Sequence, residues 1–244
     1  LSIGGTAWAG TEVSFDPTTL LENESHLVTS IPGTFTGADV AGLIGATTYY
    51  ANGIDGTNSI ASNIEAGHVW GTANGHESLT HVTSYTNHAN APSSPFATPA
   101  YDRHATWVGM MIGGRLGGTT SGNWQTGIAS QTDLRSGAIA TGWNGSAYSL
   151  SFSATVNTLD APYSGGASSF GTVDVINSSW GAATGAPPES SGMDVRSFTT
   201  DSLNDGNPLT KFVVSAGNSG DGSNTVGAPG SGYNGITVGA LQNN

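Results

Sequence analysis

The chain contains no cysteine and few charged residues, which make up 9% of the sequence. Without cysteine it cannot form disulfides, cysteine–zinc sites or a thiol nucleophile. Basic residues are the scarcest charged type: five bases stand against 17 acids, for a net charge of −12. A negative field of this size repels phosphate groups, so we expect neither nucleic acid nor an anionic membrane surface as a partner.

Long hydrophobic runs are also missing. No apolar stretch approaches the roughly 18 residues that a membrane-spanning helix requires. The sequence starts at Leu1 without a basic, apolar leader, so we expect any signal or pro-segment to have been removed or not to be included in this sequence. The polar fraction is rich in Gly, Ser, Thr and Asn, a composition that favours a loop-rich, secreted protein.

Hydrophobic residues form 36% of the chain and occur in bounded blocks, which is enough for a sizeable core. Their spacing predicts helices at 38–50, 104–114 and 193–203, and strands at 59–69, 134–140, 173–178, 211–215 and 236–240. We expect an irregular extension over about 1–35 and a loop over 76–100. Strands that alternate with helices predict an α/β fold with a mostly parallel sheet and helices on both faces. Without repeats or a clear linker, residues 1–244 are predicted to form a single domain.

Functional side chains in a parallel α/β sheet gather where strands end and loops begin. Three such stretches are Asn63–Trp70 (NIEAGHVW), Asp102–Gly109 (DRHATWVG) and Val213–Gly220 (VVSAGNSG). These stretches resemble, in order, motifs of the subtilisin-like serine peptidases. The IEAG and later HESL segments are similar to the family's Asp-Ser/Thr-Gly strand end and His-Pro-Asp-Leu. HATWVG is similar to His-Gly-Thr-His-Val-Ala-Gly, whose first His is the general base.

Further blocks extend the resemblance from about Ser59 to the end of the chain. Residues 127–138 resemble the Gly-Val-Ala-Pro segment and the strand after it. The run VINSSWG, at 175–181, is similar to the strand that pairs with bound substrate. AGNSG, at 216–220, matches the turn whose Asn stabilises the oxyanion, and 236–240 resembles the following strand. Roughly the first fifty residues are not covered.

The resemblance implies a three-layer subtilisin-like fold and peptide-bond hydrolysis through an acyl-enzyme. It implies that Glu65 orients His104, that His104 acts as general base and then acid, and that Asn218 stabilises the oxyanion. An acid…His…Ser chain order is the subtilisin arrangement. The implied substrate-binding residues are Ser179, Trp180, Gly181, Ala216 and Gly217.

Three residues depart from the family motifs. Glu65 stands where Asp is usual, although Glu serves this purpose in some Ser-His-Glu hydrolases. Ala105 replaces the Gly after the base, and Trp107 replaces the second His, where we expect it to pack in the core. Glu65 and Ala105 motivate an alternative hypothesis, a catalytically inactive binding or structural protein on a subtilisin-like scaffold.

The family's Gly-Thr-Ser nucleophile motif does not occur in this sequence. We therefore expect the fold to be incomplete without a C-terminal segment that carries the nucleophilic Ser beyond Asn244. Either the chain has been truncated or it has been proteolytically processed after Asn244. We favour processing, because losing the last strands and a central helix would cost many kcal/mol against a total stability of about 5–15 kcal/mol. The expected partners are a polypeptide substrate and that C-terminal fragment.

A histidine-rich stretch offers a third hypothesis, a metal-dependent hydrolase. It includes Glu65, His68, His76, Glu77, His81 and His88. The spacing of His76 and His81 misses the HExxH pattern by one residue, so the two imidazoles would not share a helix face. We interpret these histidines as polar residues of a surface loop, with no metal in the site. We expect no required cofactor and allow for a structural Ca²⁺.

Overall fold

The computed structural model of the chain describes residues 30–31, 34–35, 40–71, 75–87, 102–115, 126–143, 148–150, 173–181, 195–219 and 225–240. Of the expected irregular extension, only two short strands are described. β1 (Ser30–Ile31) and β2 (Thr34–Phe35) form an antiparallel pair, and the rest of that extension lies outside the described residues.

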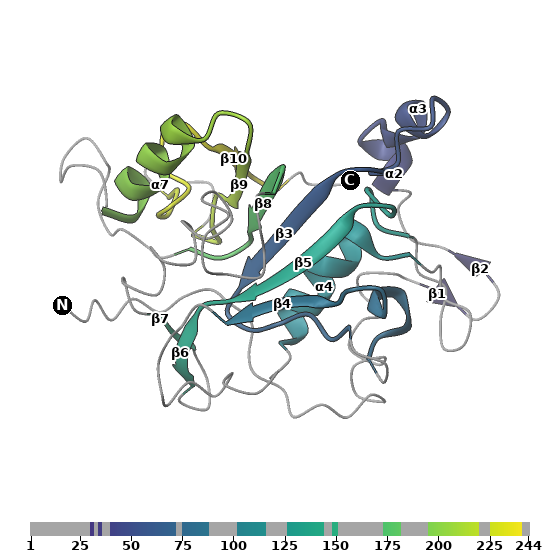
Figure 1. Ribbon diagram of the computed structural model, residues 1–244, viewed down its shortest axis with the longest axis horizontal. Helices are drawn as coiled ribbons and strands as arrows, with labels where there is room; N and C mark the ends of the chain where they lie inside the picture. Colours follow the sequence, from purple (N-terminus) through teal and green to yellow (C-terminus); the bar gives the residue numbers. More distant parts are fainter. Residues whose placement is uncertain are drawn as a thin grey trace.

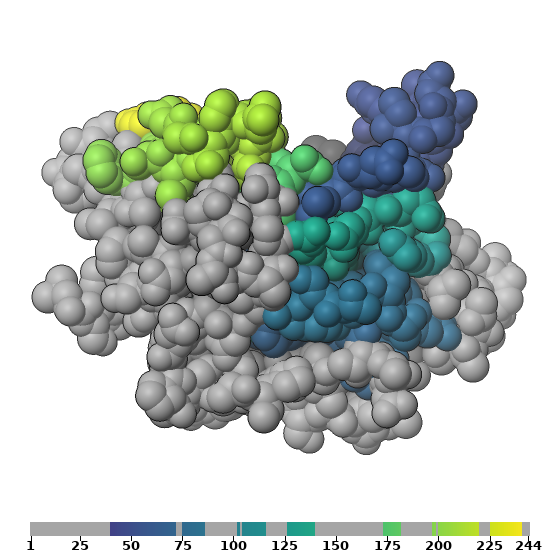
Figure 2. All heavy atoms as spheres, in the orientation of Figure 1, coloured from purple at the N-terminus to yellow at the C-terminus, as the bar shows by residue number. Residues whose placement is uncertain are grey.

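Two short helices replace the single helix predicted over 38–50. They are α2 (Val40–Leu43) and α3 (Ala46–Tyr50), and they stand out at the upper right of Figures 1 and 2. The break falls at Gly45, whose φ of 77° lies in the left-handed region that glycine adopts without a steric penalty.

A six-stranded parallel sheet forms the centre of the described structure (Figure 1). Its order is β10-β9-β8-β3-β5-β4, and all five pairings are parallel. The strands are β3 (Ile60–Glu65), β4 (Ser84–Asn87), β5 (Asp133–Ala138), β8 (Val175–Ser178), β9 (Lys211–Ser215) and β10 (Ile236–Val238). This confirms the predicted α/β class and mostly parallel sheet.

The predicted loop over 76–100 is wrong where the structure describes it. A 3₁₀ helix, η2 (Glu77–Leu79), is followed by β4, which pairs with β5 at the edge of the sheet. The polar sequence of β4, Ser-Tyr-Thr-Asn, lacks the apolar signal of a central strand. The structure also contains an antiparallel pair that the sequence did not indicate, β6 (Ala140–Trp143) and β7 (Tyr148–Leu150).

Helices cover the two faces of the sheet, as predicted. α4 (Arg103–Gly113) packs on β3 and β5. The core on that face contains Ala61, Val69, Leu79, Val82, Ala105, Met110 and Leu134. On the opposite face, Leu203 of α7 (Val195–Gly206) packs against a second cluster. That cluster contains Ile64, Ala66, Ala138, Ile139, Val173, Ile176, Trp180, Phe212 and Val214.

The two cores follow from the alternation of side chains along β3. Ala61 belongs to the α4 core and Ile64 to the α7 core, so odd-numbered residues of the strand face α4. Glu65 is the last residue of β3 and lies on the α4 side. The Glu65 carboxylate therefore lies at the end of the sheet, beside the first turn of α4.

Candidate active site

Glu65 and His104 come together at the carboxyl end of β3. The Glu65 side chain is fully buried, and its Oε2 lies 3.1 Å from Nδ1 of His104. The other carboxylate oxygen, Oε1, accepts a hydrogen bond from the backbone N–H of Ser179 at 3.0 Å. Both oxygens of the acid are therefore held, and the acid in turn fixes the imidazole.

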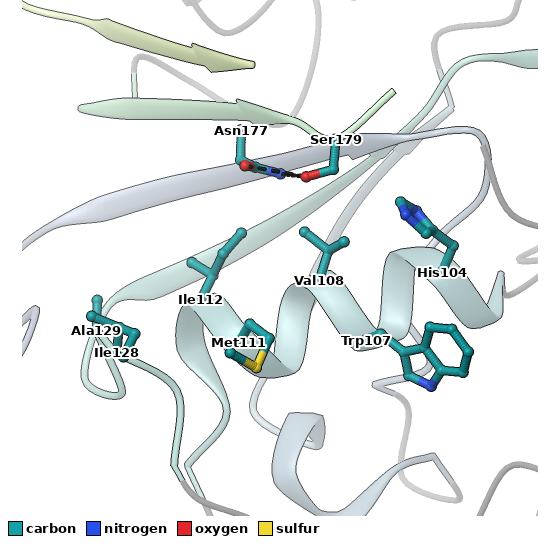
Figure 3. Close-up of a pocket in the computed structure, with 9 residues that line it drawn as sticks. All are labelled: His104, Trp107, Val108, Met111, Ile112, Ile128, Ala129, Asn177 and Ser179. Carbon is teal, nitrogen blue, oxygen red and sulfur yellow. Dashed lines mark hydrogen bonds between the residues drawn. The ribbon is translucent and has the colours of Figure 1, made fainter. Parts of the chain in front are cut away.

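One ring nitrogen of His104 is directed away from Glu65 and can take part in proton transfer. Because Nδ1 faces Glu65, the opposite nitrogen, Nε2, points away from the acid, and 28% of the side chain is exposed. In Figure 3 the ring rises from the first turn of α4 toward Ser179. An imidazole fixed at Nδ1 by a buried carboxylate can accept a proton at Nε2 and return it.

The charges around His104 favour its protonated form. Burial lowers the pKa of His104, but the Glu65 charge, the hydrogen bond to Glu65 and the Asp102 charge outweigh burial and raise the pKa to about 9. Asp102 is also buried, and burial together with the nearby Glu65 charge raises its pKa to about 6, against the opposing effect of His104. Two carboxylates thus flank one imidazole.

A row of amides lies beside the pair and connects three elements. Asn63 donates from Nδ2 to the backbone oxygen of Ala105 at 3.0 Å. Asn177 donates from Nδ2 to Oδ1 of Asn63 and to Oγ of Ser179, both at 3.0 Å. The row joins α4, β3 and β8 and thereby fixes the segment that contacts Glu65.

Sequence reasoning missed Asn63, Asn177 and Asp102. A signal for Asn63 was present, because it precedes Glu65 by two residues and therefore shares its face of the strand. Asn177 is in register with Asn63 on the neighbouring strand, which only the strand pairing reveals. Asp102 stands two residues before the predicted base, the position of a helix N-cap.

An apolar cavity of about 560 Å³ opens beside His104 (Figure 3). Its lining consists of His104, Trp107, Val108, Met111, Ile112, Ile128, Ala129, Asn177 and Ser179. Val108 and Ile112 follow His104 at intervals of four residues, so all three lie on one stripe of α4. Trp107 is only partly buried and lines this cavity, so the expectation that it packs in the core is wrong.

The predicted substrate segment, Ser179–Gly181, begins beside the acid. The backbone N–H of Ser179 is bonded to Glu65, and its hydroxyl is bonded to Asn177. The Trp180 side chain is buried in the core on the α7 side, with 1% of the residue exposed. At Gly181 a Cβ would lie 3.1 Å from the carbonyl oxygen of Ala228, so this position favours glycine.

The predicted oxyanion turn follows β9. The backbone N–H of Ala216 donates to the Val238 oxygen, and its own oxygen accepts from Gly227. Gly217 has a φ of 95°, which requires glycine. Asn218 is exposed. Its role in the site, like the substrate roles of Ala216 and Gly217, stays a prediction.

The histidine-rich stretch is not a surface loop where it is described. His68 and His76 are both 3% exposed, so that interpretation is wrong for them. His68 contacts Ser136 and the ring of Tyr85, whereas the ring of His76 accepts from the backbone N–H of Ser78. Within the described ranges no group of three His, Cys, Asp or Glu side chains is placed to hold a metal ion. His88 lies outside the described residues.

Comparison with known proteins agrees with the fold. The sequence model of the subtilase family matches residues 59–244, and the chain belongs to this family. Membership suggests serine peptidase activity. A search of curated proteins finds no match. In the part of the chain that the structure describes, no helix is long and apolar enough to cross a membrane.

Proposed function

We propose that this protein is a secreted serine endopeptidase that uses a Glu-His-Ser triad. Glu65 orients the imidazole, His104 is the general base and then the general acid, and the nucleophilic Ser lies on a segment or chain beyond Asn244. The observation that carries the proposal is the 3.1 Å contact between buried Glu65 and Nδ1 of His104.

The reaction follows the order that this geometry allows. Nε2 of His104 takes the proton of the Ser hydroxyl as its oxygen attacks the peptide carbonyl carbon, and Glu65 stabilises the imidazolium. The imidazolium then gives the proton to the leaving amine, the C–N bond breaks and an acyl-enzyme remains. Water, activated by the same nitrogen, hydrolyses the acyl-enzyme and regenerates the Ser.

The remaining site residues handle the substrate. The Asn218 side chain donates to the oxyanion that forms at the carbonyl. Ser179–Gly181 and Ala216–Gly217 provide the edge along which an extended peptide lies. Since the Ser179 N–H is bonded to Glu65, the contacts of that residue with substrate go through its carbonyl.

Exposed apolar residues at the β10 edge of the sheet support the proposal of a partner segment. Phe212 and Val214 of β9 face the α7 core, so Val213 between them faces the α4 side. Ile236 of β10 is in register with Val213, and Val238 follows on the same face. These two β10 residues are 53% and 51% exposed. The helix described on this face, α4, packs on β3 and β5 instead.

We assign this face and the cavity beside His104 to the segment that carries the nucleophile. An amphipathic helix is the usual cover for an apolar sheet face, and its burial would contribute roughly 1 kcal/mol for each half-exposed side chain it covers. A nucleophile on such a helix must lie within about 3 Å of Nε2 of His104. The cavity begins at that imidazole.

Location and cofactors complete the proposal. Secretion is common among subtilases, and the net charge of −12 keeps the surface away from nucleic acids and anionic membranes. The triad chemistry requires no cofactor. A structural Ca²⁺ is compatible with the acidic composition.

Labelling with a fluorophosphonate probe tests the proposed function. The whole protein, with any polypeptide that accompanies this chain, is treated and digested, and the labelled residue is located by mass spectrometry. We expect a labelled Ser outside residues 1–244, with labelling lost in His104→Ala and retained in the control His81→Gln. A label on Ser179 would contradict the proposed location. Complete absence of label would favour the inactive scaffold.

A further inference from the structure

The position of His104 in α4 raises an electrostatic difficulty. The residue lies in the first turn of an 11-residue helix. The N-terminal end of a helix carries a partial positive charge from unpaired N–H groups and therefore disfavours a cation. A general base at this place must nevertheless become an imidazolium during the reaction, so another group has to offset the field of the helix.

Asp102 supplies a full negative charge at this end of the helix. It is the N-cap, with extended backbone, and its side chain is fully buried. Oδ1 accepts the backbone N–H of His104 at 3.2 Å, and Oδ2 accepts the N–H of Ala105 at 3.1 Å. The carboxylate thus pairs the two donors nearest the imidazole and is shielded from solvent.

Asp102 also connects α4 to the segment that follows Glu65. Its backbone N–H donates to the oxygen of His68 at 2.8 Å, and its own oxygen accepts from the Thr106 hydroxyl at 2.8 Å. The same hydroxyl accepts the N–H of Trp70 at 3.0 Å. These bonds hold the start of α4 at a fixed distance from the end of β3, where the orienting acid lies.

We propose that Asp102 is a positioning residue of the site, a second buried carboxylate that fixes the first turn of α4 and offsets the helix field so that His104 can carry the proton. It acts through His104 and touches neither substrate nor nucleophile. The role of Asp102 in catalysis rests on the proposed function, whereas its effect on the pKa of His104 does not depend on that function.

The two charges that face Asp102 act on it in opposite directions. The Glu65 charge approaches from β3 and the His104 charge from α4 itself, whereas the segment after β3 contributes the backbone oxygen of His68. Among these, His104 is the partner that favours ionised Asp102, and the charge of Asp102 in turn raises the pKa of His104. Since burial raises the pKa of Asp102 to about 6, the carboxylate is ionised throughout the alkaline range in which His104 titrates.

Two substitutions separate the charge from the cap. Asp102→Asn and Asp102→Ser both keep an oxygen that can accept the helix N–H groups, since Asn and Ser are N-caps as good as Asp. Neither keeps the negative charge. Asp133→Asn is the matched control, because it removes one exposed carboxylate at the start of β5, where Asp133 pairs with Arg135. Thermal unfolding of each variant verifies that it is folded.

The test is an NMR titration of His104 with ¹⁵N-labelled histidine, which needs no catalytic activity. We expect the midpoint of His104 to move down by roughly half a pH unit or more in both Asp102 variants and to stay in place in Asp133→Asn. Unchanged midpoints in Asp102→Asn and Asp102→Ser would overturn the inference and reduce Asp102 to a helix cap. If the midpoints move but no variant and no wild-type protein hydrolyses peptides, the inference on His104 holds and the proposed function fails.

Discussion

The carboxylate of Glu65 accepts the backbone N–H of Ser179 at 3.0 Å, across two neighbouring strands of the sheet. The acid that holds the base is therefore also attached to the segment predicted to hold substrate. Oε2 is directed at His104 and Oε1 at Ser179, so the longer side chain of Glu serves both partners. The positions of both His104 and Ser179 therefore depend on Glu65, and the sequence motif indicates only its contact with His104.

Shortening the acid should break one half of the bridge. Glu65→Asp retracts the carboxylate by one methylene, so it cannot reach both Nδ1 of His104 and the Ser179 N–H without a shift of β3. We expect kcat to fall by roughly 10–100-fold, because small misplacements in an active site have effects of this size. The free energy of unfolding should fall by about 1–3 kcal/mol, since a donor loses its acceptor. Kinetics with a peptide substrate and urea unfolding measure the two effects. Glu77→Asp, on η2, is the control and should change neither.

Activity should rise with pH through the alkaline range. His104 must be neutral to accept a proton, and its pKa is raised to about 9, mainly by Glu65 acting against burial. Below that pH most molecules hold imidazolium and are inactive as a base, so kcat/KM should increase with pH until it levels off above about 9. A pH profile of kcat/KM checks this. A profile already flat at pH 6 would show that His104 is not held in its protonated form.

Removing the proposed oxyanion donor should impair turnover without unfolding the protein. Asn218 is exposed, so Asn218→Ala should change stability by less than about 0.5 kcal/mol. We expect kcat to fall by roughly 10²–10³-fold with little change in KM, which is the size of the effect known for the equivalent donor in subtilisin. Asn52→Ala, in the turn after α3, serves as the control. Equal kinetics for the two variants would remove Asn218 from the site.

Crowding at Gly71 gives a prediction on stability. A Cβ there would lie 2.5 Å from the Leu79 oxygen and 2.6 Å from the Tyr85 hydroxyl, whereas a Cβ at Gly206 has nothing within 4 Å. Gly71→Ala should therefore destabilise the fold by about 1–3 kcal/mol, because η2 and β4 must move. Gly206→Ala should leave the unfolding free energy nearly unchanged. Denaturant unfolding of both variants, side by side, checks the difference, and equal stability would contradict the packing described for this region.

The sequence indicated those parts of the fold whose residues carry a strong local pattern. The strand at Lys211–Ser215 agrees at both ends, and the helix that begins with the predicted base agrees to within one residue, because apolar residues recur there and paired glycines end the helix. The pairing of Glu65 with His104 could be predicted as well, since both lie at element ends that a parallel sheet brings together.

Other features depend on contacts between distant residues and have no local signal. β4 is an edge strand of polar residues, and the break at Gly45 looks like an ordinary helix position until the left-handed φ is known. Trp107 lines a cavity rather than the core, because its direction depends on where α4 sits on the sheet. The bond from Ser179 to Glu65 joins residues 114 positions apart, a relationship that only the strand order creates.

A double-mutant comparison tests most directly whether Glu65 and His104 act as one catalytic unit. Values of kcat for Glu65→Gln, His104→Ala and the combined variant are measured on the whole protein with a peptide substrate. The account predicts a loss of roughly 10³–10⁴-fold for Glu65→Gln, a larger loss for His104→Ala, and no further loss in the combined variant. Losses that multiply, or hydrolysis that continues without His104, would contradict it.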